Sequence, residues 1–229
     1  MTSTTDPLTT GMHDFGDGPI PAHRHPNGGG WVADTALVAG TAHISEDATV
    51  HGYALVVGSA RVLDAASVSG HAYVSDRAMV HGHSRVSGAA TVTDAASVGG
   101  HATIRGNARV SDYASVHGYA VVDDRSKITA RAAVHGRAAI HGDAIVWGYG
   151  EVFDSAYICD DVEVRGNARV CGHAHICGYV IVDEGACVTG TARLDGVNGD
   201  YRLDGDALID AGSYLDGTGL GGERDGEPL

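Results

Sequence analysis

Sulfur and imidazole side chains recur at a regular spacing in the second half of the chain. His141, Cys159 and Cys177 follow one another at every eighteenth position, and His175 lies just before Cys177, with one residue between them. Zinc prefers such ligands, usually four in a tetrahedron. If positions at this spacing lie side by side, these four residues form a candidate zinc site. The alternative is a set of free surface thiols and histidines. A disulfide between Cys159 and Cys177 is geometrically possible but is not expected in a reducing compartment.

A second candidate group consists of histidines that share the same spacing or lie beside one another, namely His81, His83, His101, His117 and His135. Imidazole titrates near neutral pH and binds metals, so these residues are candidates for a catalytic base, a metal site between subunits or a pH-sensitive contact. Histidine is also tolerated as a polar residue on a β-surface. An interface role without chemistry is therefore the simpler interpretation.

A third candidate group is basic, in a chain whose net charge is −14. It comprises Arg105, Asn107, Arg109, Arg125 and Lys127. Guanidinium and ammonium groups beside a turn amide can hold a carboxylate or a phosphate, which predicts a small anionic ligand. The alternative is an ion-paired surface, in which Asp123 neutralises Arg105 and Asp143 neutralises Arg125.

The elements that position these groups follow from a six-residue repeat. From Val32 to Leu194, every sixth residue is Val, Ile or Leu, for 28 positions without a miss. A small residue, mostly alanine, stands two places before each, and mostly glycine or an acid stands two places after it. The Ala-x-Val alternation predicts a short strand with two inward side chains, and the glycine or acid predicts a turn. A hexapeptide period is typical of a parallel β-helix.

Three strand-turn units would close one triangular coil, so that every eighteenth residue stacks at strand spacing. We therefore predict an all-β, single-stranded parallel β-helix of about nine to ten coils with an irregular N-terminal cap. The predicted divisions are a disordered start and cap (1–30), the β-helix (31–199), a final irregular coil with a C-terminal cap (200–217) and a disordered tail (218–229). After Leu194 the next match is Leu203, which indicates a three-residue insertion around Val197 to Asp200.

The bulk properties exclude several classes of protein. The acidic charge argues against a general nucleic-acid or membrane-surface binder, and no signal peptide or transmembrane run is visible. We therefore expect a cytoplasmic protein, with cysteines that are free thiols or metal ligands before disulfides. The segment His23-Arg24-His25 could be half of a ligand site, although surface loop histidines are the simpler interpretation.

The pattern [Val/Ile]-x-[Gly/Asp]-x-Ala-x resembles the hexapeptide-repeat superfamily over residues 32–215. The runs Gly106-Asn107-Ala108-Arg109-Val110 and Gly166-Asn167-Ala168-Arg169-Val170 look most like the YdcK-like bacterial proteins. The resemblance implies a left-handed helix and a homotrimer. Acyltransferases of this superfamily usually extrude a loop from the repeat, and gamma-type carbonic anhydrases pair two histidines five residues apart. The repeat here contains neither feature.

We therefore expect a non-catalytic structural or binding protein, presenting its faces or subunit interfaces to a protein partner or a small anionic ligand. Two enzymes remain as alternatives. One is a hexapeptide-type acyltransferase with a histidine of the second group as its base, and the other is a metal-dependent enzyme similar to a gamma-carbonic anhydrase.

Overall fold

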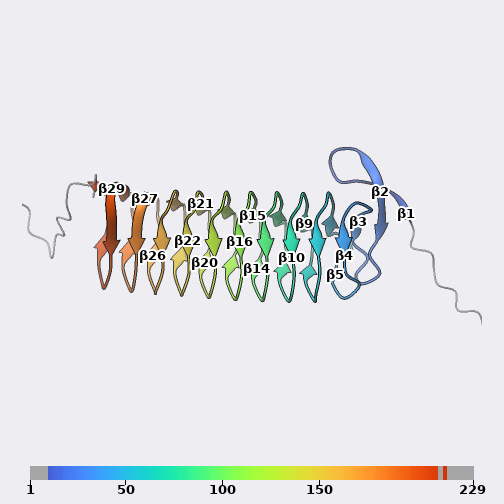
Figure 1. The fold of residues 1–229 in the computed structure, drawn as a ribbon, viewed down its shortest axis with the longest axis horizontal. Helices are drawn as coiled ribbons and strands as arrows, with labels where there is room; N and C mark the ends of the chain where they lie inside the picture. The colour runs from blue at the N-terminus through green and yellow to red at the C-terminus, as the bar shows by residue number, and fades with distance from the viewer. Residues whose placement is uncertain (1–9, 211–213, 216–229) are drawn as a thin grey trace, which may run out of the picture.

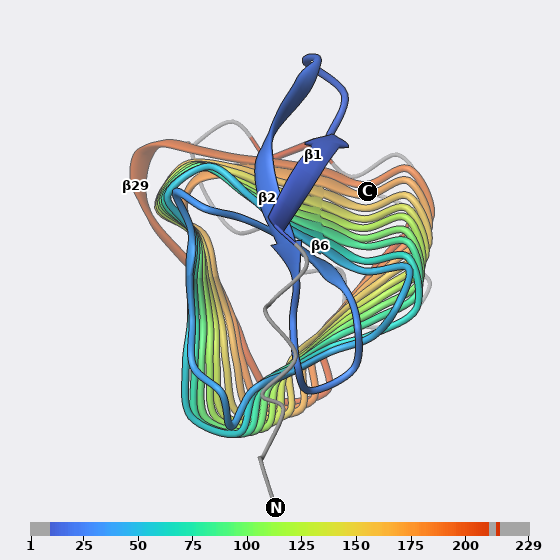
Figure 2. The same cartoon turned by 90° about the vertical axis from the view of Figure 1, so that its right-hand side faces the viewer.

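The structure, a computed structural model, describes residues 10–210 and 214–215, all of whose regular elements are β-strands. Short strands stack into a long parallel β-helix, seen from the side in Figure 1 and end-on, as a triangle, in Figure 2. The predicted fold class is confirmed. The predicted disordered segments, up to residue 9 and from residue 218 onward, lie outside the described residues. No helix among the described residues is long and apolar enough to cross a membrane.

The triangular coil has three faces, named here in chain order. Face 1 contains β3 (Trp31–Ala33), β6 (Thr49–Val50), β9 (Ser67–Val68), β12 (Arg85–Val86), β15 (Thr103–Ile104), β18 (Val121–Val122), β21 (Ala139–Ile140), β24 (Tyr157–Ile158) and β31 (Tyr214–Leu215). Face 2 contains β4 (Leu37–Val38), β7 (Leu55–Val56), β10 (Tyr73–Val74), β13 (Thr91–Val92), β16 (Arg109–Val110), β19 (Lys127–Ile128), β22 (Ile145–Val146) and β25 (Glu163–Val164). The strands β27 (His175–Val182) and β29 (Arg193–Leu203) run around the corner and belong to both faces, so that faces 1 and 2 form one continuous sheet.

Face 3 is a separate ten-stranded parallel sheet. Its strands are β5 (His43–Ile44), β8 (Arg61–Val62), β11 (Met79–Val80), β14 (Ser97–Val98), β17 (Ser115–Val116), β20 (Ala133–Val134), β23 (Glu151–Val152), β26 (Arg169–Val170), β28 (Cys187–Val188) and β30 (Leu208–Ile209). Up to β28, every eighteenth residue is in register with its counterpart in the next coil on all three faces, for example Ser97 opposite Ser115. The predicted coil length is therefore confirmed.

The inside of the triangle is filled by the aliphatic residues of the repeat and the alanines before them. From Ile44 to Val188 the aliphatic positions are fully buried. Where serine replaces alanine, its hydroxyl donates to a carbonyl at the preceding turn, from Ser84 to His81 at 2.7 Å and from Ser126 to Asp123 at 2.6 Å. These bonds let a polar group enter the core without losing its hydrogen bond.

From Gly52 to Gly190, a residue with a positive φ stands at each corner, two places after the inward aliphatic residue. Glycine takes this position most often, with φ values such as 69° at Gly82 and 72° at Gly118. Aspartate takes it elsewhere, for example Asp94 with φ 60°. Aspartate tolerates this conformation because its short side chain hydrogen-bonds locally. Ala130, with φ 59°, has no such compensation.

The N-terminal cap is a β-hairpin, and so more regular than predicted. The strands β1 (Thr10–Asp14) and β2 (Pro19–Arg24) pair antiparallel, and β2 pairs antiparallel with β3. The hairpin lies across the first coil, and its turn projects beyond the triangle (Figure 2). Antiparallel pairing covers the open edge of β3, which would otherwise be available to another chain.

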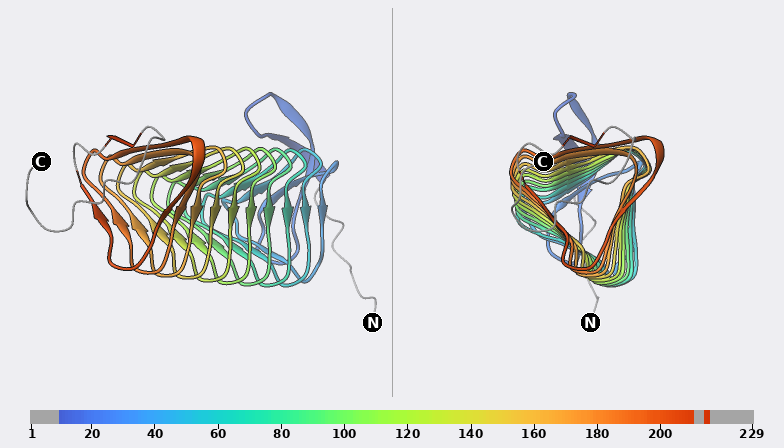
Figure 3. Two further views of the ribbon diagram at one scale, coloured as in Figure 1. Left: turned by 60° about the vertical axis from the view of Figure 1, so that its left-hand side comes forward. Right: turned by 90° about the vertical axis from the view of Figure 1, so that its left-hand side faces the viewer.

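The predicted insertion lies in β29 at the C-terminal end (Figure 3). Gly178 pairs with Gly196 and Val180 with Tyr201, so that one residue of β27 lies opposite four residues of β29. The next strand pair on face 3 is shifted by the same insertion, with Cys187 opposite Leu208. The coil continues through this bulge to Ile209, within the segment 200–217 for which a final irregular coil is predicted.

Candidate functional site

The four residues of the predicted zinc site all lie on face 1. The Cα atoms of Cys159 and Cys177 are 4.7 Å apart, and a disulfide joins their side chains. The expectation that they would not form a disulfide is therefore wrong, because coil stacking brings their sulfur atoms within bonding distance. The other two cysteines, Cys171 and Cys187 on face 3, are free thiols, and burial raises the pKa of the Cys187 thiol.

Both histidines of this group contact the same tyrosine. Tyr157 stacks on His175 with ring centroids 4.8 Å apart, and on His141 at 5.3 Å. The Nδ1 atom of His175 lies 3.8 Å from the Cys177 sulfur. Burial, together with the charge of Arg193, lowers the pKa of His175. Its imidazole is therefore neutral over a wider pH range, with a nitrogen lone pair that can bind a metal.

The histidine group divides between a corner and a face. At the corner between faces 3 and 1, His83 and His101 stack with ring centroids 5.0 Å apart, and His101 stacks on Tyr119 at 4.7 Å. Together with Arg85 and Thr103 these rings line a shallow depression. The corner stack is exposed and offers flat aromatic surface, and no carboxylate within the described chain hydrogen-bonds either imidazole.

On face 3, His117 and His135 stack with ring centroids 5.2 Å apart. The Nε2 atom of His135 donates to Glu151 at 3.0 Å, and Glu151 also accepts from Arg169 at 2.8 Å. The bond from His135, followed by the Arg169 bond and charge, outweighs partial burial and lowers the pKa of Glu151. Glu151 thus orients His135 as a carboxylate orients a general base. His81 lies 3.3 Å from the Ser97 hydroxyl and covers Gly99.

Two of the four cations in the basic group are neutralised, as the ion-paired alternative predicts for them. Arg105 donates to Asp123 at 2.5 Å, and Arg125 pairs with Asp143. Asn107 lies exposed at the corner between faces 1 and 2. Arg109 and Lys127 lie on face 2, directly opposite each other in β16 and β19. Neither cation has an acidic partner within the described part of the chain.

The segment His23-Arg24-His25 has structural contacts in the cap. His23 hydrogen-bonds Asp34 at 2.9 Å, and His25 is buried with Nδ1 3.2 Å from the Asn27 carbonyl. Arg24 lies over the Trp31 ring at 4.3 Å and donates to the Gly29 carbonyl. The segment is therefore part of the cap rather than the exposed loop that the simpler interpretation predicts, because His23 lies in β2 and His25 is buried.

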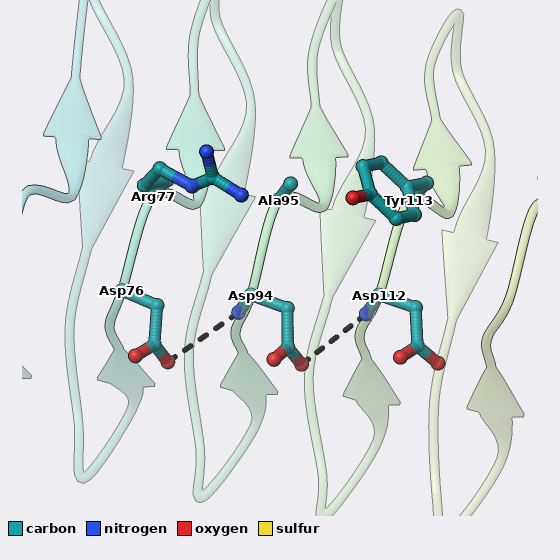
Figure 4. Close-up of a pocket in the computed structure, with 6 residues that line it drawn as sticks. All are labelled: Asp76, Arg77, Asp94, Ala95, Asp112 and Tyr113. Atoms are coloured by element: carbon teal, nitrogen blue, oxygen red, sulfur yellow. Dashed lines mark hydrogen bonds between the residues drawn. The ribbon is translucent and has the colours of Figure 1, made fainter.

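An acidic depression lies at the corner between faces 2 and 3, lined by Asp76, Arg77, Asp94, Ala95, Asp112 and Tyr113 (Figure 4). Each aspartate accepts a hydrogen bond from the backbone N–H one coil further on, from Asp94 to Asp76 at 3.4 Å and from Asp112 to Asp94 at 3.2 Å. The small side chain of Ala95 leaves the hollow between Arg77 and Tyr113. The carboxylates therefore hold the corner, and their hydrogen bonds explain the acids of the repeat.

One charged network on face 2 was not predicted. Glu163 accepts from the Trp147 indole at 2.6 Å and from Arg165 at 3.1 Å, and Arg165 also donates to Asp183 at 2.8 Å. Asp183 in turn accepts from Arg202 at 2.9 Å. The separation of Arg165 and Asp183 by one full coil period was the available signal. The three-residue insertion before Arg202 hid the pairing of Arg202 with Asp183.

The fold defines this chain as a single-stranded parallel β-helix. No known family model matches the sequence. No curated protein is similar to it at a significant level. The assignment of the fold therefore rests on the structure itself.

Proposed function

We propose that the protein is a non-catalytic β-helical rod that binds a small anionic ligand on face 2, between Arg109 and Lys127. The observation that carries the proposal is the register of these two cations, which lie directly opposite each other in adjacent parallel strands and are both exposed. Like charges in this position repel. A phosphate or carboxylate group that bridges a guanidinium and an ammonium would remove the repulsion and gain charge-assisted hydrogen bonds.

The surroundings favour a small ligand over a large one. The strands on either side place Thr91 and Ile145 in the same outward column, so that the column carries no further cation next to the pair. The protein as a whole carries a net charge of −14, which repels an extended polyanion. The two cations therefore suit a single phosphate or carboxylate group, held against a rigid and flat sheet.

Calorimetric titration with inorganic phosphate at low salt tests the proposal. Arg109→Ala and Lys127→Ala should each weaken phosphate binding about tenfold or more, since a hydrogen bond to a charged group contributes about 1.5 to 3 kcal/mol. Arg125→Ala is the matched control, because Arg125 is exposed and already paired with Asp143. Equal weakening by all three variants would indicate general electrostatic attraction and would overturn the proposal.

The assembly is part of the same proposal. We propose a homotrimer with rods side by side, supported by the resemblance to the hexapeptide-repeat superfamily and its YdcK-like members. Light scattering coupled to size-exclusion chromatography should give a mass three times the chain mass of 23.4 kDa. A monomeric mass at micromolar concentration would contradict it.

A second candidate function is acyl transfer at a subunit interface. One observation favours it, namely the bond that orients His135 toward Glu151 at 3.0 Å. In that case His135 is the general base, and His135→Ala should abolish turnover of a coenzyme A thioester while leaving the fold intact. His83→Ala is the control, because His83 belongs to the corner stack. A carbonic anhydrase-like site has less support, because no three histidines converge as metal ligands within the described residues.

A further inference from the structure

Cysteine, aspartate and histidine side chains meet on face 1 where it turns into face 2. Cys159 and Cys177 occupy equivalent positions in successive coils. Asp160 is the positive-φ residue of its corner, with φ 59°, and its carboxylate points toward the next coil. There it accepts the Gly178 N–H at 3.1 Å, and it lies 3.6 Å from the Cys159 sulfur. The backbone conformation at this corner thus places the Asp160 carboxylate beside the sulfurs of Cys159 and Cys177.

A nitrogen donor approaches from the same strand as Cys177. The Nδ1 atom of His175 is 3.8 Å from the Cys177 sulfur, and the stacked Tyr157 ring fixes the imidazole plane. On the far side of Tyr157, His141 is held away, with its own Nδ1 3.9 Å from an Asp124 oxygen. The candidate metal ligands at this corner are therefore the two sulfurs, the Asp160 carboxylate and the His175 imidazole.

The separations of these donors suit a small thiophilic cation. The donor atoms of Cys159, Asp160 and Cys177 all lie within 4.8 Å of one another, and no other group of three His, Cys, Asp or Glu donors in the described part of the chain does so. With zinc bonds of about 2.3 Å to sulfur and about 2.0 to 2.2 Å to nitrogen or oxygen, neighbouring donors in a tetrahedron lie roughly 3.3 to 3.8 Å apart. The separations of 3.6 Å between the Cys159 sulfur and Asp160 and of 3.8 Å between the Cys177 sulfur and His175 fall in this range. His175 lies outside the group of three, so that its imidazole has to move toward Cys159 and Asp160, and the two sulfurs have to separate, to complete the tetrahedron.

We propose that Cys159, Asp160, His175 and Cys177 form a redox-gated zinc site. In the disulfide form the two sulfurs are bonded to each other and provide no thiolate. A cellular dithiol opens the site by thiol–disulfide exchange: its two sulfurs become a disulfide, and its two protons pass to the sulfurs of Cys159 and Cys177. Zinc then binds the two thiolates and displaces those protons. Both cysteines are partly exposed, so that a dithiol can reach the bond.

The second cysteine pair provides an internal control. Cys171 and Cys187 also stand in successive coils, but on face 3, where the Cys171 thiol lies 3.2 Å from the Thr189 hydroxyl. Within the described residues no carboxylate or imidazole joins them to make a third donor. The proposal therefore assigns the metal to one pair of cysteines and not to the other.

The experiment titrates cobalt, as a spectroscopic substitute for zinc, into the full chain. One sample is reduced with a phosphine, which does not compete for metal, and the other is left oxidised. The reduced protein should bind one cobalt per chain, show thiolate-to-cobalt charge-transfer absorption and lose it on addition of zinc. The oxidised protein should show no such absorption. Strong absorption by the oxidised protein, or none by the reduced protein, would overturn the proposal.

Variants assign the ligands. Cys159→Ser and Cys177→Ser should each abolish the charge-transfer band, whereas the double variant Cys171→Ser/Cys187→Ser should retain it. His175→Ala should weaken binding by more than the roughly 10- to 100-fold that loss of an outer-shell partner costs. Circular dichroism of each variant verifies that the β-helix is intact. An unchanged band in Cys159→Ser and Cys177→Ser, or its loss in the face 3 double variant alone, would refute the assignment.

Discussion

Arg109 and Lys127 lie directly opposite each other in the parallel strands β16 and β19, and the coil period alone brings them together. We predict that Lys127→Glu stabilises the protein by about 0.2 to 1 kcal/mol, because it replaces a repulsive cross-strand pair with an attractive one. Urea denaturation at low salt measures the change. The control is Arg85→Glu, which alters the net charge equally but faces Ser67 and Thr103. A gain of equal size in the control would show that the register of the two cations is irrelevant.

Ala130 occupies a corner position that otherwise holds glycine or a residue with a polar side chain, at φ 59°. Replacing it with glycine should raise the free energy of unfolding by about 0.5 to 1 kcal/mol. The left-handed conformation costs a residue with a Cβ roughly 1 to 2 kcal/mol, and the greater freedom of glycine in the unfolded chain offsets about 0.4 to 1 kcal/mol of that. Ala89→Gly, at a corner residue without a positive φ, should instead destabilise the protein. Thermal or urea unfolding of both variants decides the matter, and a loss of stability in Ala130→Gly would contradict the prediction.

Acid should loosen the N-terminal hairpin. His13 stacks on Trp31 at 4.5 Å and Phe15 stacks on His51 at 4.9 Å. Burial lowers the pKa of both histidines below the ordinary value of 6.5, and the Arg24 charge lowers that of His13 further. The detached hairpin therefore binds more protons than the docked one, and docking weakens as the pH falls below about 6.5. Asp17 opposes the effect at His51.

The fluorescence of Trp31 in a Trp147→Phe background follows this transition. The double variant His13→Gln/His51→Gln should lose the acid-dependent change. His71→Gln should keep it, since His71 stacks on Tyr53 outside the cap. An acid transition that persists unchanged in the double variant would mean that other groups control the cap.

Asp183 should be the most sensitive carboxylate on face 2. Its side chain is 12% exposed, and it accepts hydrogen bonds from Arg165 and Arg202. We expect Asp183→Asn to cost about 2 to 3 kcal/mol, because two guanidinium groups lose a charged acceptor. Asp143→Asn is the control: its side chain is 40% exposed and pairs with Arg125, which is 71% exposed, so that the cost should stay below about 1 kcal/mol. Equal losses on urea unfolding would contradict the view that burial strengthens the Asp183 network.

The sequence alone determined every spatial relationship between residues that follows from the six-residue repeat and the 18-residue coil. The repeat placed Val and Ala inside, fixed the length of the coil, located the insertion before Tyr201 and paired Arg105 with Asp123. A parallel β-helix has one register, because shifting a strand by one residue would turn its buried side chains outward. Side chains in one column are therefore neighbours whatever their identity, and arithmetic is enough to find them.

Only the tertiary structure decided which side chains contact residues other than those stacked 18 positions away. His135 reaches Glu151, 16 residues away on the next coil, and His175 turns toward Cys177 on its own strand. The bond between Cys159 and Cys177 and the packing of the Phe15 ring on His51 are likewise contacts that the period alone does not predict. These contacts depend on rotamers and on the backbone direction at each corner, and many different rotamers satisfy the same period. The candidate metal ligands could be placed on one face from the sequence, but only the folded chain shows which of them meet.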